Sequence, residues 1–374
     1  MKIAAIKENN LDENRVAISP DTCKKFSQNS LEVLIEKNAG VSSSFLDSDY
    51  EKNGAKILEK EEILKNADIL LSVSSLPSDK DLNILKKNIT IIGMLNPYEN
   101  FKEIEKLAIN NFNIITLELL PRISRAQSMD VLSSQANLAG YKAVIEASSM
   151  FKKALPMMMT AAGTIIPAKC LVLGAGVAGL QAIATAKRLG CVVSAFDVRP
   201  EVKEQVNSLG AKFISVENTK ENNNNDTVYA KEMSESYKQK QAEKIHQASV
   251  EMDIIISTAQ IPGKKAPLLI TSNTIKSMKN GSVLIDLAAS SGGNIEGSVL
   301  GEKTQLANVI LYSPKNLPSL ISHDASLLYA KNVLNFVTNF LDDNKKFDNQ
   351  SSDELIVKTS IIKDGKKTSN FFEG

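Results

Sequence analysis

A chain of 374 residues is too long for one ordinary domain, so the sequence predicts two. Hydrophobic residues make up 43% of the chain and charged residues 23%, which is typical of a globular protein in water. The 44 Lys and Arg residues nearly balance the 43 Asp and Glu residues, and a net charge of +1 lacks the basic excess that binds nucleic acid, so we expect no nucleic-acid partner.

The N-terminus predicts neither export nor a membrane span. Its first ten residues, MKIAAIKENN, become charged before a signal-peptide apolar region could form. No apolar run in the chain approaches the ~18 residues that cross a bilayer. The three cysteines lack metal-ligand spacing and are expected to be buried structural thiols: Cys23, Cys170 and Cys191. We expect a cytoplasmic protein whose membrane anchor, if it needs one, lies on another polypeptide.

The first 130 residues alternate strand-like and helical patterns. The pair Ser19-Pro20 predicts a helix start, since serine is a favoured cap and proline suits the first helical position. Strands alternating with helices imply a parallel sheet. The expected strands are MKIAAIKE (1–8), LEVLIEKNAG (31–40), ADILLSVSS (67–75) and ITIIGML (89–95).

A helical stretch from Leu132 to Phe151 leads into a second unit of the same kind. Helical spacing over 327–341 predicts a helix that packs back on the first unit, and 354–367 is expected to form a strand and turn. The expected strands of the second unit are KCLVLGAG (169–176), CVVSAFDV, AKFISV, DIIISTA, SVLIDLA and finally LANVILY (306–312). The predicted fold is α/β: two Rossmann-like domains with parallel sheets flanked by helices, residues 1–132 with 316–374, and residues 133–315.

Residues 217–227, ENTKENNNNDT, are too polar to bury a face and predict a long mobile loop. A loop of this length inside a compact domain is either functional or disordered, and composition leaves both open. A helix rich in lysine, glutamate and glutamine is expected to follow at YAKEM (229–233).

A glycine pattern predicts a dinucleotide site in the second unit. Gly174, Gly176 and Gly179 lie between a strand and a helix, where glycine permits a tight turn, close approach of a pyrophosphate and close helix–strand packing. The helix N-terminus adds unpaired N–H groups for the phosphates. The next strand ends at Asp197, 23 residues past Gly174, where a ribose-binding acid belongs.

Asp197 predicts a preference for NAD(H), since a carboxylate accepts hydrogen bonds from ribose and repels a 2′-phosphate. Arg199 is close enough to soften that preference. The expected cofactor contacts in this unit are Gly174, Ala175, Gly176, Val177, Gly179, Asp197, Val198 and Arg199.

The segment from Pro121 to Ser133 crowds polar side chains between an apolar strand and an apolar helix. Gln127, Asp130 and Ser133 are three residues apart, so a helical turn would place them on one face. The same segment also suits an ordinary helix N-terminus with serine caps and an Arg–Asp pair. Spacing alone does not choose between a site and local order.

The chain has only two histidines, His246 and His323, and both suit surface or capping positions. Carbonyl reduction needs a proton donor beside the hydride donor, usually histidine or lysine. Hydride transfer between two nicotinamide rings moves no separate proton and needs only the two rings in contact. The scarcity of histidine therefore favours ring-to-ring transfer.

Over nearly its whole length the sequence resembles the NAD(H)-binding component, domain I, of proton-translocating nicotinamide nucleotide transhydrogenases. Of the motifs that carry the resemblance, PRISRAQSMD is the most specific and the glycine pattern the least. They are ENRVAISP (13–20), PRISRAQSMD (121–130), SSQANLAGYKAV (133–144), PMMMTAAGT (156–164), GAGVAGLQAIATAKRLG (174–190), YAKEM (229–233) and IPGKKAP (261–267).

The resemblance implies roles for individual residues. Arg122, Gln127 and Asp130 would be the catalytic set, holding the nicotinamide end of the cofactor, with Gln127 positioning its ring. The implied cofactor contacts around this set are Ile123, Ser124 and Ser133, and further along the chain Val228, Tyr229, Met233, Gln241 and Gln260.

Tyr229 and Met233 would lie on a loop that closes over NAD(H). Two positions depart from the family pattern: Val228 replaces a glycine and Gln260 a leucine. Valine tolerates positive φ poorly, which puts the geometry of the closed loop in doubt. The run Met157–Met159 belongs to the pattern, and its plain interpretation is core packing.

The resemblance also implies an assembly. It predicts a homodimer that faces an NADP(H)-binding domain, with membrane subunits that couple hydride transfer to proton translocation. Because the chain ends near residue 374, it is similar to transhydrogenases in which this component is a separate subunit, peripheral on the inner face of the membrane.

Two other functions compete with this one. Alanine dehydrogenase is a homologue, but Ser74 stands where its substrate-binding lysine belongs and Met94 where its acid–base histidine belongs, although Arg15 and Asn316 are retained. A non-catalytic NAD-binding subunit would keep the glycine pattern and have no need of the polar residues around Gln127.

Overall fold

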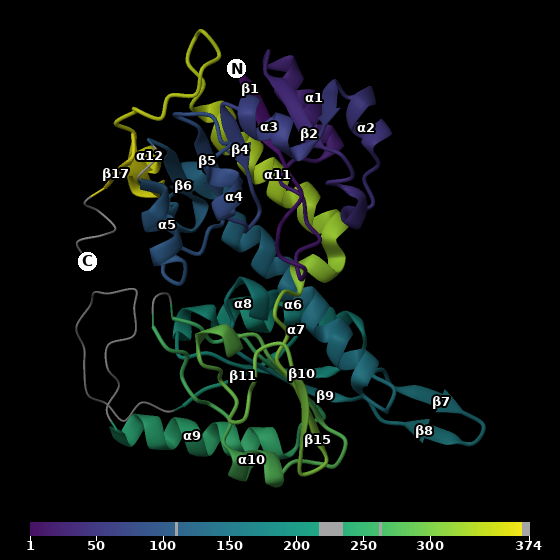
Figure 1. The fold of residues 1–374 in the computed structure, drawn as a ribbon. Helices are drawn as coiled ribbons and strands as arrows, with labels where there is room; N and C mark the ends of the chain where they lie inside the picture. The colour runs from purple at the N-terminus through teal and green to yellow at the C-terminus, as the bar shows by residue number, and fades with distance from the viewer. Residues whose placement is uncertain (109–110, 217–234, 262–263, 369–374) are drawn as a thin grey trace. The chain divides into compact units, whose positions relative to one another are not determined.

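The computed structural model describes residues 1–108, 111–216, 235–261 and 264–368 (Figure 1). The chain divides into two compact units, Met1–Gln135 with Pro318–Gly374 and Ala136–Leu317, and the division falls inside helix α6 (Val131–Met150). Each unit is built on a largely parallel sheet flanked by helices, which confirms the predicted α/β class. No helix in the described ranges combines the length and apolar character of a membrane span.

The first unit contains a sheet in the order β17-β16-β6-β5-β4-β1-β2-β3. The strands from β3 to β6 are parallel, and β16 runs antiparallel to β6. Ile3 and Ala5 belong to one apolar cluster and Ala4 to another, so the sheet is buried on both faces, as parallel sheets are. Its strands are β1 (Lys2–Ala5), β2 (Glu32–Glu36), β3 (Ala55–Leu58), β4 (Ile69–Leu71), β5 (Thr90–Gly93), β6 (Asn113–Thr116), β16 (Ser360–Lys363) and β17 (Lys366–Lys367).

Short helices connect these strands. Helix α1 (Pro20–Gln28) begins behind an N-cap at Ser19, whose hydroxyl accepts from Thr22 N at 3.3 Å, so the predicted helix start is confirmed. The others are α2 (Asp47–Lys52), α3 (Lys60–Asn66), α4 (Asp79–Leu82), α5 (Phe101–Leu107), α11 (Ser322–Asn339) and α12 (Glu354–Thr359), with 3₁₀ turns η1 (Val41–Ser43), η3 (Leu117–Leu119), η4 (Ser124–Met129) and η7 (Pro318–Ile321).

The prediction of a strand over 354–367 is wrong for its first half. Residues 354–359 form α12, and only then does the chain extend into β16 and β17. A short apolar run does not distinguish a buried strand from a buried helix by period. Here Asp353 decides, because its carboxylate accepts from Leu355 N at 2.8 Å and caps the helix.

The second unit contains a sheet in the order β11-β10-β9-β12-β13-β15-β14. The strand β14, which the sequence analysis missed, is a polar antiparallel edge with no apolar alternation to reveal it. The strands are β9 (Lys169–Leu173), β10 (Val192–Phe196), β11 (Lys212–Ile214), β12 (Ile254–Ser257), β13 (Val283–Asp286), β14 (Lys303–Leu306) and β15 (Val309–Tyr312). The helices are α7 (Val177–Arg188), α8 (Lys203–Ser208), α9 (Glu235–Val250) and α10 (Ser272–Lys276), with η5 (Pro200–Val202) and η6 (Ala289–Ser291).

A separate hairpin, β7 (Met158–Thr160) and β8 (Gly163–Ile165), extends away from this sheet (Figure 1). Met157 and Met159 are 60% and 79% exposed, so the prediction that the methionine run packs in the core is wrong. Ile166, just after the hairpin, is also 79% exposed. Among the described residues β7 and β8 pair only with each other, and a two-stranded ribbon has no second layer to bury its side chains.

The C-terminal segment completes the core of the first unit through α11. The side chain of Tyr329 is fully buried, and its hydroxyl donates to the carbonyl of Ser72 at 2.6 Å, across 257 residues of sequence. Val333, Phe336 and Val337 continue the same apolar cluster. The predicted packing of this helix against the first unit is therefore confirmed.

We expect Tyr329→Phe to lower the free energy of unfolding by about 1–2 kcal/mol, because it leaves the buried Ser72 carbonyl without this donor. Chemical denaturation followed by circular dichroism measures the change. Tyr141→Phe, at a 40% exposed tyrosine of α6, is the control and should alter stability by less than about 0.5 kcal/mol. Equal effects of the two substitutions would contradict a special role for the Tyr329 hydroxyl.

Candidate dinucleotide-binding site

The loop between β9 and α7 carries the glycine pattern, and its three glycines face different surroundings. Gly174 has φ +93°, a conformation that other residues rarely adopt. A Cβ at Gly179 would lie 1.8 Å from the Gly174 carbonyl oxygen, so α7 packs against the loop too closely for any side chain. A Cβ at Gly176 would meet nothing within 4 Å.

These surroundings fit a bound pyrophosphate. Gly176 is the N-cap of α7 and makes no side-chain cap, so the first N–H groups of the helix face the open space at this glycine. Those N–H groups and the helix dipole favour an anion. Ala175 is buried behind the loop, and Val177, in the first turn, is 42% exposed.

Asp197 follows β10, which pairs in parallel with β9, so its carboxylate and the glycine loop lie at the same edge of the sheet. The carboxylate accepts from Ala175 N at 2.7 Å. Burial alone would raise the pKa of Asp197, but hydrogen bonds from Arg199 and from Ala175 N outweigh burial and hold that pKa below its usual range. Asp197 is therefore a carboxylate at neutral pH, held against the loop.

Arg199 binds Asp197 through both side-chain nitrogens that face it. Its Nε lies 3.0 Å from Oδ1 of Asp197 and its terminal nitrogen 2.9 Å from Oδ2. The guanidinium is thus committed to the carboxylate, while the side chain remains 46% exposed. Val198, between the two, is 36% exposed.

Thr258 and Asn294 support this edge of the sheet, and the sequence analysis missed both. The hydroxyl of Thr258 donates to the carbonyls of Leu173 and Gly174, at 3.2 and 3.1 Å. Asn294 is fully buried and bonds to Ala259 through both ends of its amide. The positions follow β12 and β13, and position after a strand was the only available signal.

The remaining predicted contacts of this unit are less closely tied to the loop. Gln260 is exposed, and its amide nitrogen donates to the carbonyl of Leu287 at 2.9 Å. Gln241 lies half-buried on α9 and has no hydrogen bond to the glycine loop among the described residues. Val228, Tyr229 and Met233 lie outside the described residues.

The polar segment of the first unit forms the 3₁₀ turn η4, which ends at Met129, and α6 begins at Val131. Arg122, Ser124 and Gln127 are exposed, and within the described ranges the side chains of Arg122 and Gln127 have no hydrogen-bond partner. Ile123, between them, is half-buried. Two polar side chains without an internal partner are available to a ligand.

Asp130 interrupts the two helices and caps the second. Its carboxylate accepts from Ser133 N at 2.9 Å and from the Ser133 hydroxyl at 2.6 Å. Asp130 and Ser133 therefore meet, as their spacing predicts. The prediction of one helical face that includes Gln127 is wrong, because Asp130 has extended backbone angles between η4 and α6.

The ordinary explanation of this segment, a local Arg–Asp pair, is also only half right. Arg125 does form an ion pair, but with Asp353 at the start of α12, at 2.7 and 2.8 Å. The pair is bidentate, yet Arg125 is 48% exposed, so its contribution to stability is at most about 1 kcal/mol.

The corresponding edge of the first unit's sheet is already filled by Glu8. In a parallel sheet the ligand crevice lies where the strand order reverses, here between β1 and β4. Glu8 follows β1, and its carboxylate accepts from the N–H groups of Val73, Ser74 and Ser75 at 2.6, 3.1 and 2.8 Å. The chain's own anion thus uses the donors that a bound anion would use.

Arg15 is likewise occupied. It is buried, and its guanidinium donates to Glu13 through two nitrogens, at 2.7 and 2.6 Å, and to Gln135 at 2.7 Å. The hydroxyl of Ser74 lies 3.4 Å from the same Glu13 carboxylate. Met94 packs against the apolar cluster of this unit.

Neither histidine belongs to these groups of residues. His246 pairs with the Thr274 hydroxyl at 2.9 Å, and His323 with the Ser43 carbonyl at 3.0 Å. All three cysteines are buried and free of disulfides, as expected.

The three glycine environments generate a paired prediction. Gly179→Ala should cost at least about 2 kcal/mol of stability, because its methyl group overlaps a backbone carbonyl. Gly176→Ala should leave stability within about 0.5 kcal/mol of the parent, because space is open there. It should nevertheless weaken NADH binding at least about tenfold by filling the approach to the α7 N-terminus.

Thermal denaturation and NADH fluorescence titration measure the two quantities for each variant. Unchanged NADH affinity in Gly176→Ala would remove this loop from the proposed phosphate contacts.

Known proteins share this architecture along the chain. The family models described as Alanine dehydrogenase/PNT, N-terminal domain and Alanine dehydrogenase/PNT, C-terminal domain match residues 4–139 and 143–370. A relative from Rickettsia prowazekii, the first of the separate polypeptides that make up its NAD(P) transhydrogenase subunit alpha, is 46% identical over 98% of this chain and 96% of its own length.

A solved structure and a second relative place the chain within that family. The crystal structure of transhydrogenase from Sinorhizobium meliloti superposes with a TM-score of 0.86 at 42% identity, covering 98% of both chains. Alanine dehydrogenase 1 of Staphylococcus aureus is 28% identical over 91% of this chain and 88% of its own. The chain therefore belongs to the alanine dehydrogenase/PNT family, and within it to the NAD(P) transhydrogenase alpha subunits.

Proposed function

We propose that this chain binds NAD(H) and exchanges hydride with NADP(H) held on a partner domain, as one subunit of a Re/Si-specific, proton-translocating transhydrogenase. Proton translocation would belong to membrane subunits that hold this chain at the inner face of the membrane. The reaction balances without a free proton: NADH and NADP⁺ become NAD⁺ and NADPH.

The observation that carries the proposal is the Asp197 carboxylate beside the glycine loop. It is ionised at neutral pH and fixed by Ala175 N, 2.7 Å away. A carboxylate there accepts hydrogen bonds from ribose and repels a 2′-phosphate. This supports NAD(H) over NADP(H) on this chain, and Arg199 then orients the acid rather than recruiting a phosphate.

Hydride transfer is the chemistry that bound NADH supplies, and the protein must present the nicotinamide to a second ring. Arg122 and Gln127, exposed and without internal partners in the described ranges, are suited to bind its polar carboxamide end. Asp130 holds the Ser133 hydroxyl in place at 2.6 Å. We assign Arg122, Gln127 and Asp130, with Ile123, Ser124 and Ser133, to the nicotinamide contacts, and Val228, Tyr229, Met233, Gln241 and Gln260 to the remaining cofactor contacts.

The alternative, an alanine dehydrogenase, meets an obstacle in the first unit. Such an enzyme needs a cation for the substrate carboxylate and a proton carrier. The guanidinium of Arg15 is already bound to Glu13 and Gln135, and Ser74 and Met94 supply neither a cation nor a titratable group. This supports transfer between dinucleotides over amino-acid oxidation.

The decisive experiment follows a deuterium label. NADH labelled at one C4 position of its nicotinamide is mixed with this chain and the NADP⁺-loaded partner domain of a related transhydrogenase. We expect the label in NADPH only when both proteins are present, and only from one of the two C4 positions. Oxidation of NADH by pyruvate and ammonia without the partner would instead identify an amino-acid dehydrogenase. NADH binding without either reaction would favour a non-catalytic subunit.

Within this assay, Gln127→Asn should slow label transfer at least about tenfold while NADH affinity stays within about threefold, because a shorter amide misplaces the ring without removing the phosphate and ribose contacts. Ser128→Ala, at the next exposed residue of η4, is the matched control. Transfer at the parental rate in Gln127→Asn would exclude the assigned role.

We further propose that the chain forms a homodimer through the β7–β8 hairpin. Met157, Met159, Ile165 and Ile166 are 60%, 79%, 42% and 79% exposed, and the segment from 157 to 166 contains no charged residue. A contiguous apolar surface of this kind is typical of a protein contact. A second copy of the same chain would cover it.

Met159→Glu combined with Ile166→Glu should convert the dimer to a monomer, raising the dissociation constant at least about 100-fold, since charges are depleted from the centres of interfaces. Sedimentation velocity measures the change. Leu268→Glu, at a 56% exposed leucine outside the hairpin, should leave the dimer intact. A dimer that survives the hairpin substitutions would assign the contact to another surface.

A further inference from the structure

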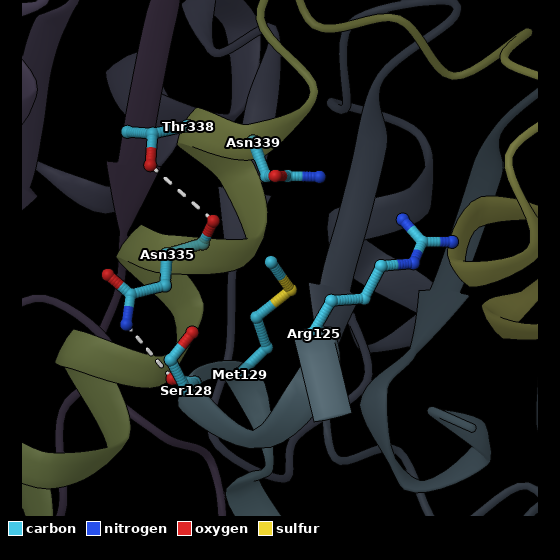
Figure 2. A pocket seen from close by; sticks show the side chains of 6 residues that line it. All are labelled: Arg125, Ser128, Met129, Asn335, Thr338 and Asn339. Carbon is cyan, nitrogen blue, oxygen red and sulfur yellow. Dashed lines mark hydrogen bonds between the residues drawn. The ribbon is translucent and has the colours of Figure 1, made fainter. Parts of the chain in front are cut away.

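The carbonyl of Ser128 receives two amide side chains from the far end of the sequence. Asn332 Nδ2 lies 2.8 Å from this oxygen and Asn335 Nδ2 lies 2.9 Å from it. The two asparagines are three residues apart on α11 and therefore share one face of the helix. Figure 2 shows Asn335 reaching toward Ser128 at the wall of an open depression of about 450 Å³.

The position of that carbonyl explains why it needs donors from outside. Ser128 is the last residue but one of η4, and the carbonyls at the end of a helix have no partner within it. A carbonyl oxygen has two lone pairs. Asn332 and Asn335 occupy both and so fix the end of the turn that carries Gln127, the preceding residue.

Core packing does not account for an asparagine at position 332. The residue is only 9% exposed, and its Oδ1 is buried without a hydrogen-bond partner among the described residues. An unsatisfied buried amide oxygen costs free energy that a leucine would avoid. The compensation visible in the structure is the hydrogen bond from its Nδ2 to Ser128.

A second tie reaches the same turn from α12. Arg125, one helical turn before Ser128, pairs with Asp353 through both guanidinium nitrogens that face it. This pair is half-exposed and contributes little by itself. Together with the asparagines it holds η4 at both ends to the C-terminal segment.

We propose that Asn332 and Asn335 are positioning residues for hydride transfer, which act through the Ser128 carbonyl to hold Gln127 in register with the nicotinamide. This inference rests on the proposed function, since it takes Gln127 as the residue that orients the transferring ring. The asparagines touch neither the cofactor nor the partner in this assignment. Their effect is on the geometry of η4 alone.

The test substitutes Asn335→Asp, which keeps the shape of the side chain and replaces the amide donor with an oxygen that repels the carbonyl. Asn335 is half-buried, so the variant should fold. Asn339→Asp is the matched control: Asn339 lines the same depression one turn further along α11, makes no side-chain hydrogen bond among the described residues, and receives the same change of charge. Asn335→Ala, which removes one donor without repulsion, should give an intermediate effect.

Two readouts separate the inference from the function on which it rests. Hydrogen–deuterium exchange over residues 123–130 should be about fivefold faster in Asn335→Asp than in the parent or in Asn339→Asp. Label transfer from NADH should fall by about 10-fold to 100-fold, with NADH affinity within about threefold and melting temperature equal to that of the control. A fall in affinity or melting temperature without a fall in transfer would mark the asparagines as merely structural.

Unchanged exchange over 123–130 would overturn the inference whatever the activity. Faster exchange with parental transfer would overturn the link to hydride transfer while leaving the proposed function intact. Failure of the parent chain itself to transfer label would count against the proposed function and with it the link to hydride transfer.

Discussion

The close approach of α7 to the loop after β9 is the constraint on which the dinucleotide site depends. No side chain fits between Gly179 and the carbonyl of Gly174, so the helix begins directly over the end of the strand. That placement leaves the open space at Gly176 in front of the helix N-terminus. It also brings Ala175 N within 2.7 Å of Asp197, which links the phosphate end of the site to its ribose end.

The two units use one architecture for different purposes because their charges are arranged differently. In the second unit the crevice at the strand ends is lined by backbone donors and an ionised Asp197. In the first unit Glu8 already accepts from three successive N–H groups, and Glu13 occupies Arg15. The first unit therefore contributes its exposed turn, η4, rather than a crevice.

That turn is held by distant segments of the chain. The fully buried Tyr329 joins α11 to the end of β4, and the same helix sends Asn332 and Asn335 to the Ser128 carbonyl. Packing and hydrogen bonding thus place the polar side chains of η4 on a rigid support while leaving Gln127 exposed. A site of this kind needs the support as much as the residues that face the ligand.

The sequence by itself determined what depends on neighbours a few residues apart: most strands, the cap at Ser19, the glycine loop, the acid at Asp197 and the contact between Asp130 and Ser133. Only the tertiary structure decided which partners distant residues take. Arg125 meets Asp353 across 228 residues, the methionines of β7 are exposed because no layer covers their hairpin, and residues 354–359 are helical under the cap of Asp353. Period and spacing describe one segment at a time, whereas burial and pairing depend on which segments fold together.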